Sequence, residues 1–246
     1  MIVFSDLDGT LLDRDSYSYA QAEPAITHLR ERGIRLVLVT SKTRAEVEAL
    51  RAEMGNTDPF IVENGAAAVI PERGEIRLGA TAAEARDALR RASNASGVHV
   101  RGFGEMSIAE ICERSGLTPD VAELAARREY GEPFAVVAGD VAALTAALEE
   151  LGYRVTRGGR FFHVLGGYDK GRAVAAVAER LDDTDTVGLG DAPNDIGFLK
   201  AVRQAVIIPS PHLDAMRAAL PEAIVAQEPG PAGWNRAVLA LARKCP

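Results

Sequence analysis

Short apolar runs alternate with amphipathic segments over the first quarter of the chain. The runs at residues 1–5, 34–39 and 60–62 have the length of buried strands, and a polar loop follows each of them. Residues 22–32 and 44–54 repeat apolar positions at helical spacing, and a glycine follows each segment. Strands that alternate with helices in this way predict a parallel sheet covered by helices.

The pattern changes in the middle of the chain. Residues 66–78 and 153–165 predict hairpins, the second with its turn at 157–160. Helical spacing is found at 82–95 and again at 140–151, where Asp140 is the expected cap. Hairpins mixed with helices are typical of an α+β module with an antiparallel sheet.

Strand–helix alternation resumes in the last third of the chain. Strands are predicted at 186–189, 205–208 and 223–225, with helical segments between them. A turn rich in glycine and proline at 228–234 precedes a last helix. The parallel sheet is therefore expected to continue after the α+β module.

These segments predict two domains in one α/β protein. Residues 1–80 and 166–246 would form a discontinuous core with a Rossmann-like parallel sheet, and residues 81–165 an inserted α+β domain. A chain of 246 residues is long enough to bury a core in either one large domain or two smaller ones.

Composition limits the partners of the protein. A net charge of −7 argues against a nucleic-acid surface and against adhesion to an anionic membrane. The two cysteines, Cys112 and Cys245, cannot form a disulfide framework and suit a reducing compartment. With no signal peptide at the start and no apolar run of membrane-spanning length, we expect a cytoplasmic protein. The oligomeric state stays open.

Polar side chains gather in the loops that follow the predicted strands or begin helices. They form four groups: Asp6 and Asp8 with Gly9 and Thr10; Thr40, Ser41 and Lys42; Asp169, Lys170 and Gly171; and Asp191, Asn194 and Asp195. Ligands of parallel sheets bind beyond the carboxyl ends of the strands, so these loops are expected to meet. Transfer of a phosphoryl group needs a nucleophile, a proton donor, a hard cation and positive donors, and these side chains can supply that set.

The four groups resemble the motifs of haloacid-dehalogenase-superfamily phosphatases. Residues 6–10 match DxDGT, Thr40 stands at the small-hydroxyl position, Lys170 matches the motif lysine, and residues 190–195 match GDxxND. Taken alone, Asp-Leu-Asp-Gly could be a polar turn after a strand. The match of all four motifs in order favours a catalytic site.

The resemblance implies a role for each motif residue. Asp6 would be the nucleophile that forms an aspartyl-phosphate, and Asp8 would protonate the leaving alkoxide and later deprotonate water. Lys170 would offset negative charge, and the cofactor would be Mg²⁺. The implied metal ligands are Asp6, Asp8 through its backbone carbonyl, Asp191 and Asp195. The implied phosphate-binding residues are Leu7, Thr40 or Ser41, Lys170 and Asn194.

The inserted domain resembles the cap of the Cof-type sugar-phosphatase branch. Narrower features, at residues 40–43, 63–65, 128–134, 159–164 and 230–234, resemble the mannosyl-3-phosphoglycerate phosphatase family. That resemblance implies release of phosphate from a phosphorylated glycoside to leave mannosylglycerate, a compatible solute. The expected substrate-binding residues are Lys42, Glu63, Asn64, Gly65, Ala66, Arg128, Glu129, Arg160 and His163. A glycerate carboxylate would need donors, for which Ser41, Lys42, Arg160 and the amides of Gly65 and Ala66 are candidates. Sugar hydroxyls would need acceptors, for which Glu63, Glu129 and Asp140 are candidates.

Three other functions fit parts of the sequence. The protein could be another sugar-phosphate phosphatase, acting on sucrose phosphate or a hexose phosphate. It could be a phosphomutase, which returns the phosphoryl group to its substrate instead of giving it to water. A non-catalytic ligand sensor is disfavoured, because Asp6, Asp8, Lys170 and Asp191 are all present.

Overall fold

The computed structural model of the chain describes residues 1–158 and 160–242. Gly159, in the predicted turn, and Cys245 lie outside the described residues. The described chain divides into two compact units. The first contains Met1–Thr40, Asn56–Ile76 and the chain from Asp169 onward, and the second contains Ser41–Gly55 and Arg77–Tyr168. The boundaries predicted from the sequence, near residues 80 and 166, stay a prediction.

An eight-stranded sheet forms the centre of the first unit, in the order β12-β11-β10-β1-β2-β3-β4-β5. The strands are β1 (Ile2–Ser5), β2 (Arg35–Val39), β3 (Phe60–Val62), β4 (Ala67–Ile70), β5 (Gly74–Arg77), β10 (Thr186–Gly190), β11 (Gln204–Ile207) and β12 (Ile224–Val225). Strand β1 lies in the middle and pairs in parallel with both β2 and β10. The predicted α/β fold with a parallel-sheet core is confirmed.

The register of the central strands brings their carboxyl ends to one edge. Ser5, the last residue of β1, lies opposite Leu189 of β10 and Leu38 of β2. Because these strands run in the same direction, the residues that follow them emerge side by side. Asp6, Thr40 and Asp191 therefore begin neighbouring loops.

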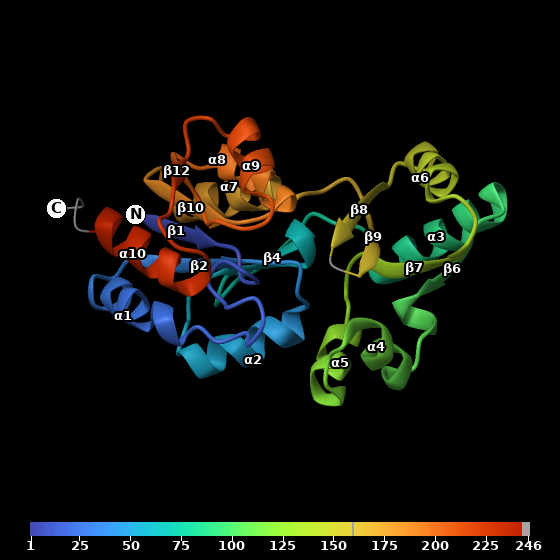
Figure 1. Cartoon of the computed structure of the whole chain (residues 1–246), viewed down its shortest axis with the longest axis horizontal. Helices are drawn as coiled ribbons and strands as arrows, with labels where there is room; N and C mark the ends of the chain where they lie inside the picture. The colour runs from blue at the N-terminus through green and yellow to red at the C-terminus, as the bar shows by residue number, and fades with distance from the viewer. Residues whose placement is uncertain (159, 243–246) are drawn as a thin grey trace. The chain divides into compact units, whose positions relative to one another are not determined.

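Helices cover both faces of this sheet (Figure 1). Helices α1 (Glu23–Glu31) and α10 (Gly230–Ala242) lie on one face, and α7 (Lys170–Leu181), α8 (Ile196–Ala201) and α9 (Leu213–Ala219) on the other. Strands β1, β2 and β10 are buried along their length apart from the exposed Arg35, and most of their residues are apolar, as expected for a sheet covered on both sides.

The turn predicted at 228–234 is wrong from Gly230 onward, because α10 begins there. Proline fits the first turn of a helix, where its missing N–H removes no internal hydrogen bond. Pro231 therefore starts the helix instead of preventing it. Gly233 and Trp234 are buried helical residues.

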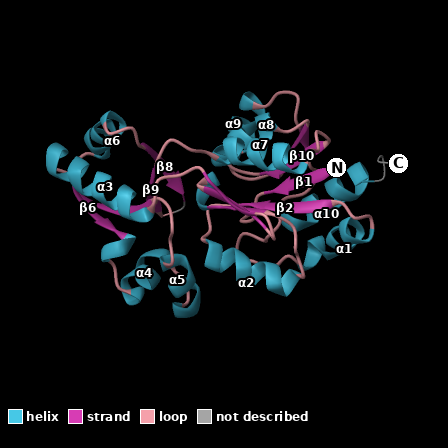
Figure 2. Cartoon of the chain, turned by 180° about the vertical axis from the view of Figure 1, so that it is seen from behind, coloured by secondary structure: helices cyan, strands magenta, loops and turns pink. Residues whose placement is uncertain are grey.

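The second unit contains a four-stranded antiparallel sheet in the order β6-β7-β9-β8 (Figure 2). Its strands are β6 (His99–Gly102), β7 (Glu132–Ala138), β8 (Arg154–Gly158) and β9 (Phe161–Leu165). Helices α3 (Ala82–Ser96) and α6 (Val141–Glu150) pack on one face, around Phe134. Helices α2 (Arg44–Met54), α4 (Ile108–Ser115) and α5 (Pro119–Ala126) complete the unit. This unit has the antiparallel α+β character that the middle of the sequence predicts.

Among the described residues, no helix combines the length and the hydropathy that a membrane crossing requires.

Candidate active site

The centre of the site is a buried lysine between two carboxylates. Lys170 begins α7, and Asp169 caps that helix by accepting a hydrogen bond from the Arg172 backbone N–H. Lys170 Nζ lies 2.5 Å from Asp6 Oδ1 and 2.7 Å from Asp195 Oδ1. The lysine side chain is 1% exposed. A cation buried this deeply is stable only when it is paired, so Lys170 fixes the position of both carboxylates.

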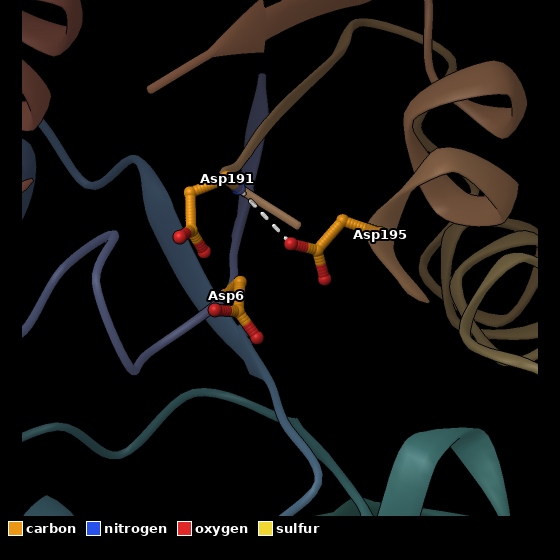
Figure 3. A group of neighbouring side chains, drawn as sticks. All are labelled: Asp6, Asp191 and Asp195. Carbon is orange, nitrogen blue, oxygen red and sulfur yellow. Dashed lines mark hydrogen bonds between the residues drawn. The ribbon is translucent and has the colours of Figure 1, made fainter. Parts of the chain in front are cut away.

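Asp195 also organises the loop after β10. Its Oδ2 accepts hydrogen bonds from the backbone N–H groups of Asp191 and Ala192, both at 3.0 Å. Figure 3 shows the first of these bonds and the carboxylates of Asp6, Asp191 and Asp195 gathered around one space. Gly190 permits the close approach, since a Cβ there would lie 2.7 Å from the Asp195 Cβ.

Asp191 is held from three directions. Thr10 Oγ1 donates to Asp191 Oδ1 at 3.3 Å, and Arg14 Nη2 donates to Oδ2 at 2.5 Å. Ser210 Oγ donates to the Asp191 backbone oxygen at 2.6 Å. Gly9, at φ +84°, leaves the room for Arg14, because a Cβ there would lie 2.7 Å from Arg14 Nη2. The DxDGT segment therefore positions the Asp191 carboxylate, through Thr10 and Gly9, in addition to supplying Asp6 and Asp8.

Burial and repulsion from neighbouring carboxylates raise the pKa values of Asp6 and Asp191. Burial raises the pKa of Asp6 well above its usual value, the charges of Asp195 and Asp191 add to this, and Lys170 opposes it. Burial and Asp195 raise the pKa of Asp191 to about 6, with Arg14 acting against the shift. Burial would lower the pKa of Lys170, but the two carboxylates outweigh it, so the pKa is raised and the lysine stays charged.

The three carboxylates fit a divalent cation. Asp6, Asp191 and Asp195 each offer an oxygen, and these oxygens lie within 4.8 Å of one another. Hard cations such as Mg²⁺ and Ca²⁺ take oxygen ligands of this kind. Repulsion among the carboxylates also raises the pKa of Asp6, and a divalent positive charge would relieve it. The donor set and its excess of negative charge therefore both suit a metal ion.

The other predicted residues of the first unit lie around these loops. Thr40 is buried after β2, and its backbone oxygen accepts from the Asn64 N–H at 2.9 Å. Asn194 is exposed in the turn before α8. The remaining residues of this group, all buried, are Leu7, Glu63, Asn64, Gly65 and Ala66.

Gly65 has a clear structural reason to be glycine. Its φ is +92°, and a Cβ would lie 2.3 Å from the Asp169 backbone oxygen. The loop after β3 therefore packs directly against Asp169, the residue that caps the helix of Lys170. Gly65 supports the position of Lys170, and its predicted contact with substrate stays a prediction.

The second unit brings several predicted substrate residues together at the start of α2. Arg128 Nη2 donates to the Ser41 backbone oxygen at 3.2 Å, and Glu129 Oε1 lies 3.1 Å from Arg44 Nε. Lys42 Nζ is 3.9 Å from Glu46 Oε1. The structure therefore groups Ser41, Lys42, Arg128 and Glu129, although they come from distant parts of the sequence.

Arg160 and His163 lie elsewhere in this unit. Arg160 is exposed and donates to the Arg114 backbone oxygen at 3.3 Å, at the end of α4. His163 is half-buried on β9, opposite Pro133 of β7 and Thr156 of β8. Their roles in substrate binding stay predictions.

Sequence reasoning missed two parts of the site. Arg14, which holds Asp191, stands in a polar segment where nothing in the pattern distinguishes it from a surface arginine. Ser5 and Trp234 were the second omission. The indole of Trp234 donates to Ser5 Oγ, and the one sequence signal for Trp234 is the resemblance of residues 230–234 to the family motif.

Comparison with known proteins identifies relatives of the whole chain. A family model described as haloacid dehalogenase-like hydrolase matches residues 3–91. A "Glucosyl-3-phosphoglycerate/mannosyl-3-phosphoglycerate phosphatase" from Persephonella marina is 39% identical over 97% of this chain and 96% of its own. A "Mannosyl-3-phosphoglycerate phosphatase" from Pyrococcus horikoshii is 32% identical over 85% of this chain and 90% of its own. The sucrose-phosphatase of Synechocystis, solved with sucrose and phosphate, has the same fold, with a TM-score of 0.70 at 17% identity and 98% coverage of both chains.

The fold and the carboxylate–lysine site define a haloacid dehalogenase-like hydrolase that acts on phosphoric monoesters, as the sequence predicts. The 39% identity over 97% of the chain assigns the protein to a particular family within this class. The chain belongs to the family of glucosyl-3-phosphoglycerate/mannosyl-3-phosphoglycerate phosphatases.

Proposed function

We propose that this enzyme is a Mg²⁺-dependent phosphatase that acts on mannosyl-3-phosphoglycerate or its glucosyl counterpart. The products would be phosphate and the glycosylglycerate, a compatible solute. The observation that carries the proposal is the ion-paired group of Lys170, Asp6 and Asp195 at the end of β1. The names of relatives that match nearly the whole chain supply the substrate class.

The first step is attack by Asp6 on the phosphorus atom. Lys170 holds Oδ1, so we assign the attack to Oδ2. A bond forms between this oxygen and phosphorus while the bond from phosphorus to the glycerate oxygen breaks. Asp8 gives its proton to the departing glycerate oxygen. The products of this step are an aspartyl-phosphate on Asp6 and the released glycosylglycerate.

The second step is hydrolysis of the aspartyl-phosphate. Asp8, now ionised, takes a proton from a water molecule as that water attacks phosphorus. The bond between phosphorus and Asp6 breaks, and the Asp6 carboxylate is restored. Lys170 stays charged in both steps, because its pKa is raised, and it offsets charge on the phosphoryl oxygens.

Asp6 and Asp191, with the backbone oxygen of Asp8, would hold the magnesium ion. The cation would supply positive charge that favours the ionised form of Asp6 and offsets the negative charge of the phosphoryl group. Asp195, the third carboxylate of the cluster, would act on the metal indirectly, because its Oδ1 already accepts from Lys170 and its Oδ2 accepts from the Asp191 backbone N–H, which fixes the position of Asp191 as a ligand.

A substrate panel tests the proposal. Phosphate release would be measured with mannosyl-3-phosphoglycerate, glucosyl-3-phosphoglycerate, sucrose phosphate, simple hexose phosphates and 3-phosphoglycerate. We expect kcat/KM for one or both glycosyl substrates to exceed the others at least tenfold. Equal rates on hexose phosphates would overturn the narrower substrate, and an isomeric sugar phosphate instead of free phosphate would indicate a phosphomutase.

A further inference from the structure

Trp234 is joined to the strand that carries the nucleophile. Its side chain is fully buried on α10, and its Nε1–H donates a hydrogen bond to Ser5 Oγ at 2.9 Å. The Ser5 hydroxyl in turn donates to the backbone oxygen of Asp6 at 2.7 Å. These two bonds form a relay from α10 to the residue that we assign as the nucleophile.

The segment before Trp234 fixes the position of the indole. A Cβ at Gly233 would lie 1.7 Å from the Glu228 backbone oxygen, so the first turn of α10 can fold against Glu228 only with glycine there. Asn235 Oδ1 accepts a hydrogen bond from the Ala25 N–H at 2.9 Å, which ties the next turn of α10 to α1. These contacts of Gly233 and Asn235 hold the start of α10 in place, so that the indole N–H of Trp234 lies against Ser5.

The relay acts on a single peptide group. The peptide between Asp6 and Leu7 is planar and trans, so its C=O and N–H point in opposite directions. Holding the C=O with Ser5 therefore directs the Leu7 N–H to the other side. The Asp6 N–H is also held, by the Leu189 oxygen at 2.9 Å. The backbone of the nucleophile is thus fixed on both sides.

We propose that Trp234 and Ser5 are positioning residues for phosphoryl transfer, which fix the Asp6–Leu7 peptide so that the Asp6 carboxylate and the Leu7 N–H both face the phosphoryl group. The proposal rests on the proposed function for the roles of Asp6 and Leu7. Hydrogen bonds in series polarise one another, so the relay also makes the Leu7 N–H a stronger donor. It gives a function to the motif at 230–234 that the known catalytic motifs leave unexplained.

The first test separates the hydrogen bond from the packing of the ring. Trp234→Phe keeps a buried aromatic ring and removes the donor. A neutral hydrogen bond contributes about 1 kcal/mol, so we expect kcat to fall about five- to tenfold, with KM changed less than about twofold. The affinity for orthovanadate, a pentacoordinate phosphate mimic, falls in the same proportion. Val238→Ala, a cavity variant at a buried position of the same helix, lowers Tm but keeps kcat within about twofold.

A double-mutant cycle tests whether the two residues act together. Ser5→Ala removes both bonds, and we expect kcat to fall about ten- to a hundredfold. Because the tryptophan acts through the serine, the double variant has the kcat of Ser5→Ala alone. If Trp234→Phe keeps the wild-type kcat and vanadate affinity, or if the two effects multiply, the relay is overturned. Trp234→Phe decides the matter even if Ser5→Ala does not fold.

A spectroscopic measurement keeps the inference separate from the proposed substrate. Trp234 is the only tryptophan in the sequence, so its indole N–H gives one resonance in a ¹⁵N-labelled sample. We expect slow solvent exchange in the wild type, fast exchange in Ser5→Ala, and a shifted Leu7 amide resonance in Trp234→Phe. If no substrate releases phosphate but these shifts occur, the proposed function fails and the relay stands. If phosphate is released but the Leu7 resonance does not move, the relay fails alone.

Discussion

Replacing Lys170 by methionine tests the electrostatic basis of the site. The side chain is 1% exposed and pairs with two carboxylates, at 2.5 and 2.7 Å. Methionine is of similar length but carries no charge, so Asp6 and Asp195 would lose their buried partner. Removing one member of a buried ion pair costs about 3–5 kcal/mol. For a chain of this size we expect Tm to fall by roughly 6–20 °C.

The loss also depends on pH, in a direction that the pKa shifts determine. Asp6 has a raised pKa in the folded protein, so the folded state binds its proton more tightly than the unfolded state does. Such a group favours the folded state at low pH, and this contribution disappears as the pH rises from the unfolded pKa through the folded one. Lys170 opposes the shift, so without it the folded pKa of Asp6 rises further. We therefore expect Lys170→Met to be destabilised more at pH 8 than at pH 5.

Activity and stability are then compared with a matched control. Loss of a group that stabilises transferring charge typically lowers kcat by about 10²–10³, and we expect at least this for Lys170→Met. Its activity also recovers toward high pH, where more of Asp6 is ionised. Lys200→Met makes the same change at an exposed position of α8 and should leave kcat and Tm unchanged. A Lys170→Met enzyme with kcat within tenfold of the wild type and an unaltered Tm would refute the reasoning.

Three further predictions follow from the contacts. In Arg14→Gln, the pKa of Asp191 rises above about 6, because the arginine charge that opposes the effect of burial is gone. Carboxyl NMR titration of the metal-free protein measures this pKa, and an unchanged value would exclude the ion pair. Burial raises the pKa of Glu132 to about 7, so the wild type loses up to about 3 kcal/mol of unfolding free energy between pH 4.5 and 7. Glu132→Gln should lack this part of the slope, and parallel denaturation profiles would contradict the assignment. Gly65→Ala places a Cβ 2.3 Å from the Asp169 backbone oxygen at a residue with positive φ. We expect urea unfolding to show a loss of roughly 2–4 kcal/mol in the free energy of unfolding. An unchanged urea midpoint would show that the loop can move to accommodate the methyl group.

The parallel-sheet core and the carboxylates at its edge could be predicted from the sequence, because both depend on the local pattern of apolar and polar residues. The alternation of apolar runs and amphipathic segments is enough to place a parallel sheet, and ligands of such a sheet lie beyond its strand ends. Asp6 and Asp191 could therefore be expected at one edge before any contact was known. The register of β1 with β10 then brings them together.

Contacts between segments far apart in the sequence could not be predicted from the local pattern. The ion pair of Arg14 with Asp191 joins residues 177 positions apart, and the bond between Trp234 and Ser5 joins residues 229 positions apart. The start of α10 was missed because glycine and proline usually mark turns, whereas here they begin a tightly packed helix. In each case tertiary packing decides the outcome, and the local sequence is compatible with a surface loop.

Covalent transfer to Asp6 is the central claim, and a rapid-quench experiment tests it most directly. The enzyme is mixed with glycosyl-3-phosphoglycerate that carries a radiolabelled phosphoryl group, stopped with acid within the first turnover, and separated from small molecules. The account predicts that label stays on the wild-type protein, is released by hydroxylamine as expected of an acyl phosphate, and is absent from Asp6→Asn. Phosphate release by the wild type with no protein-bound label, or by Asp6→Asn at the wild-type rate, would contradict it.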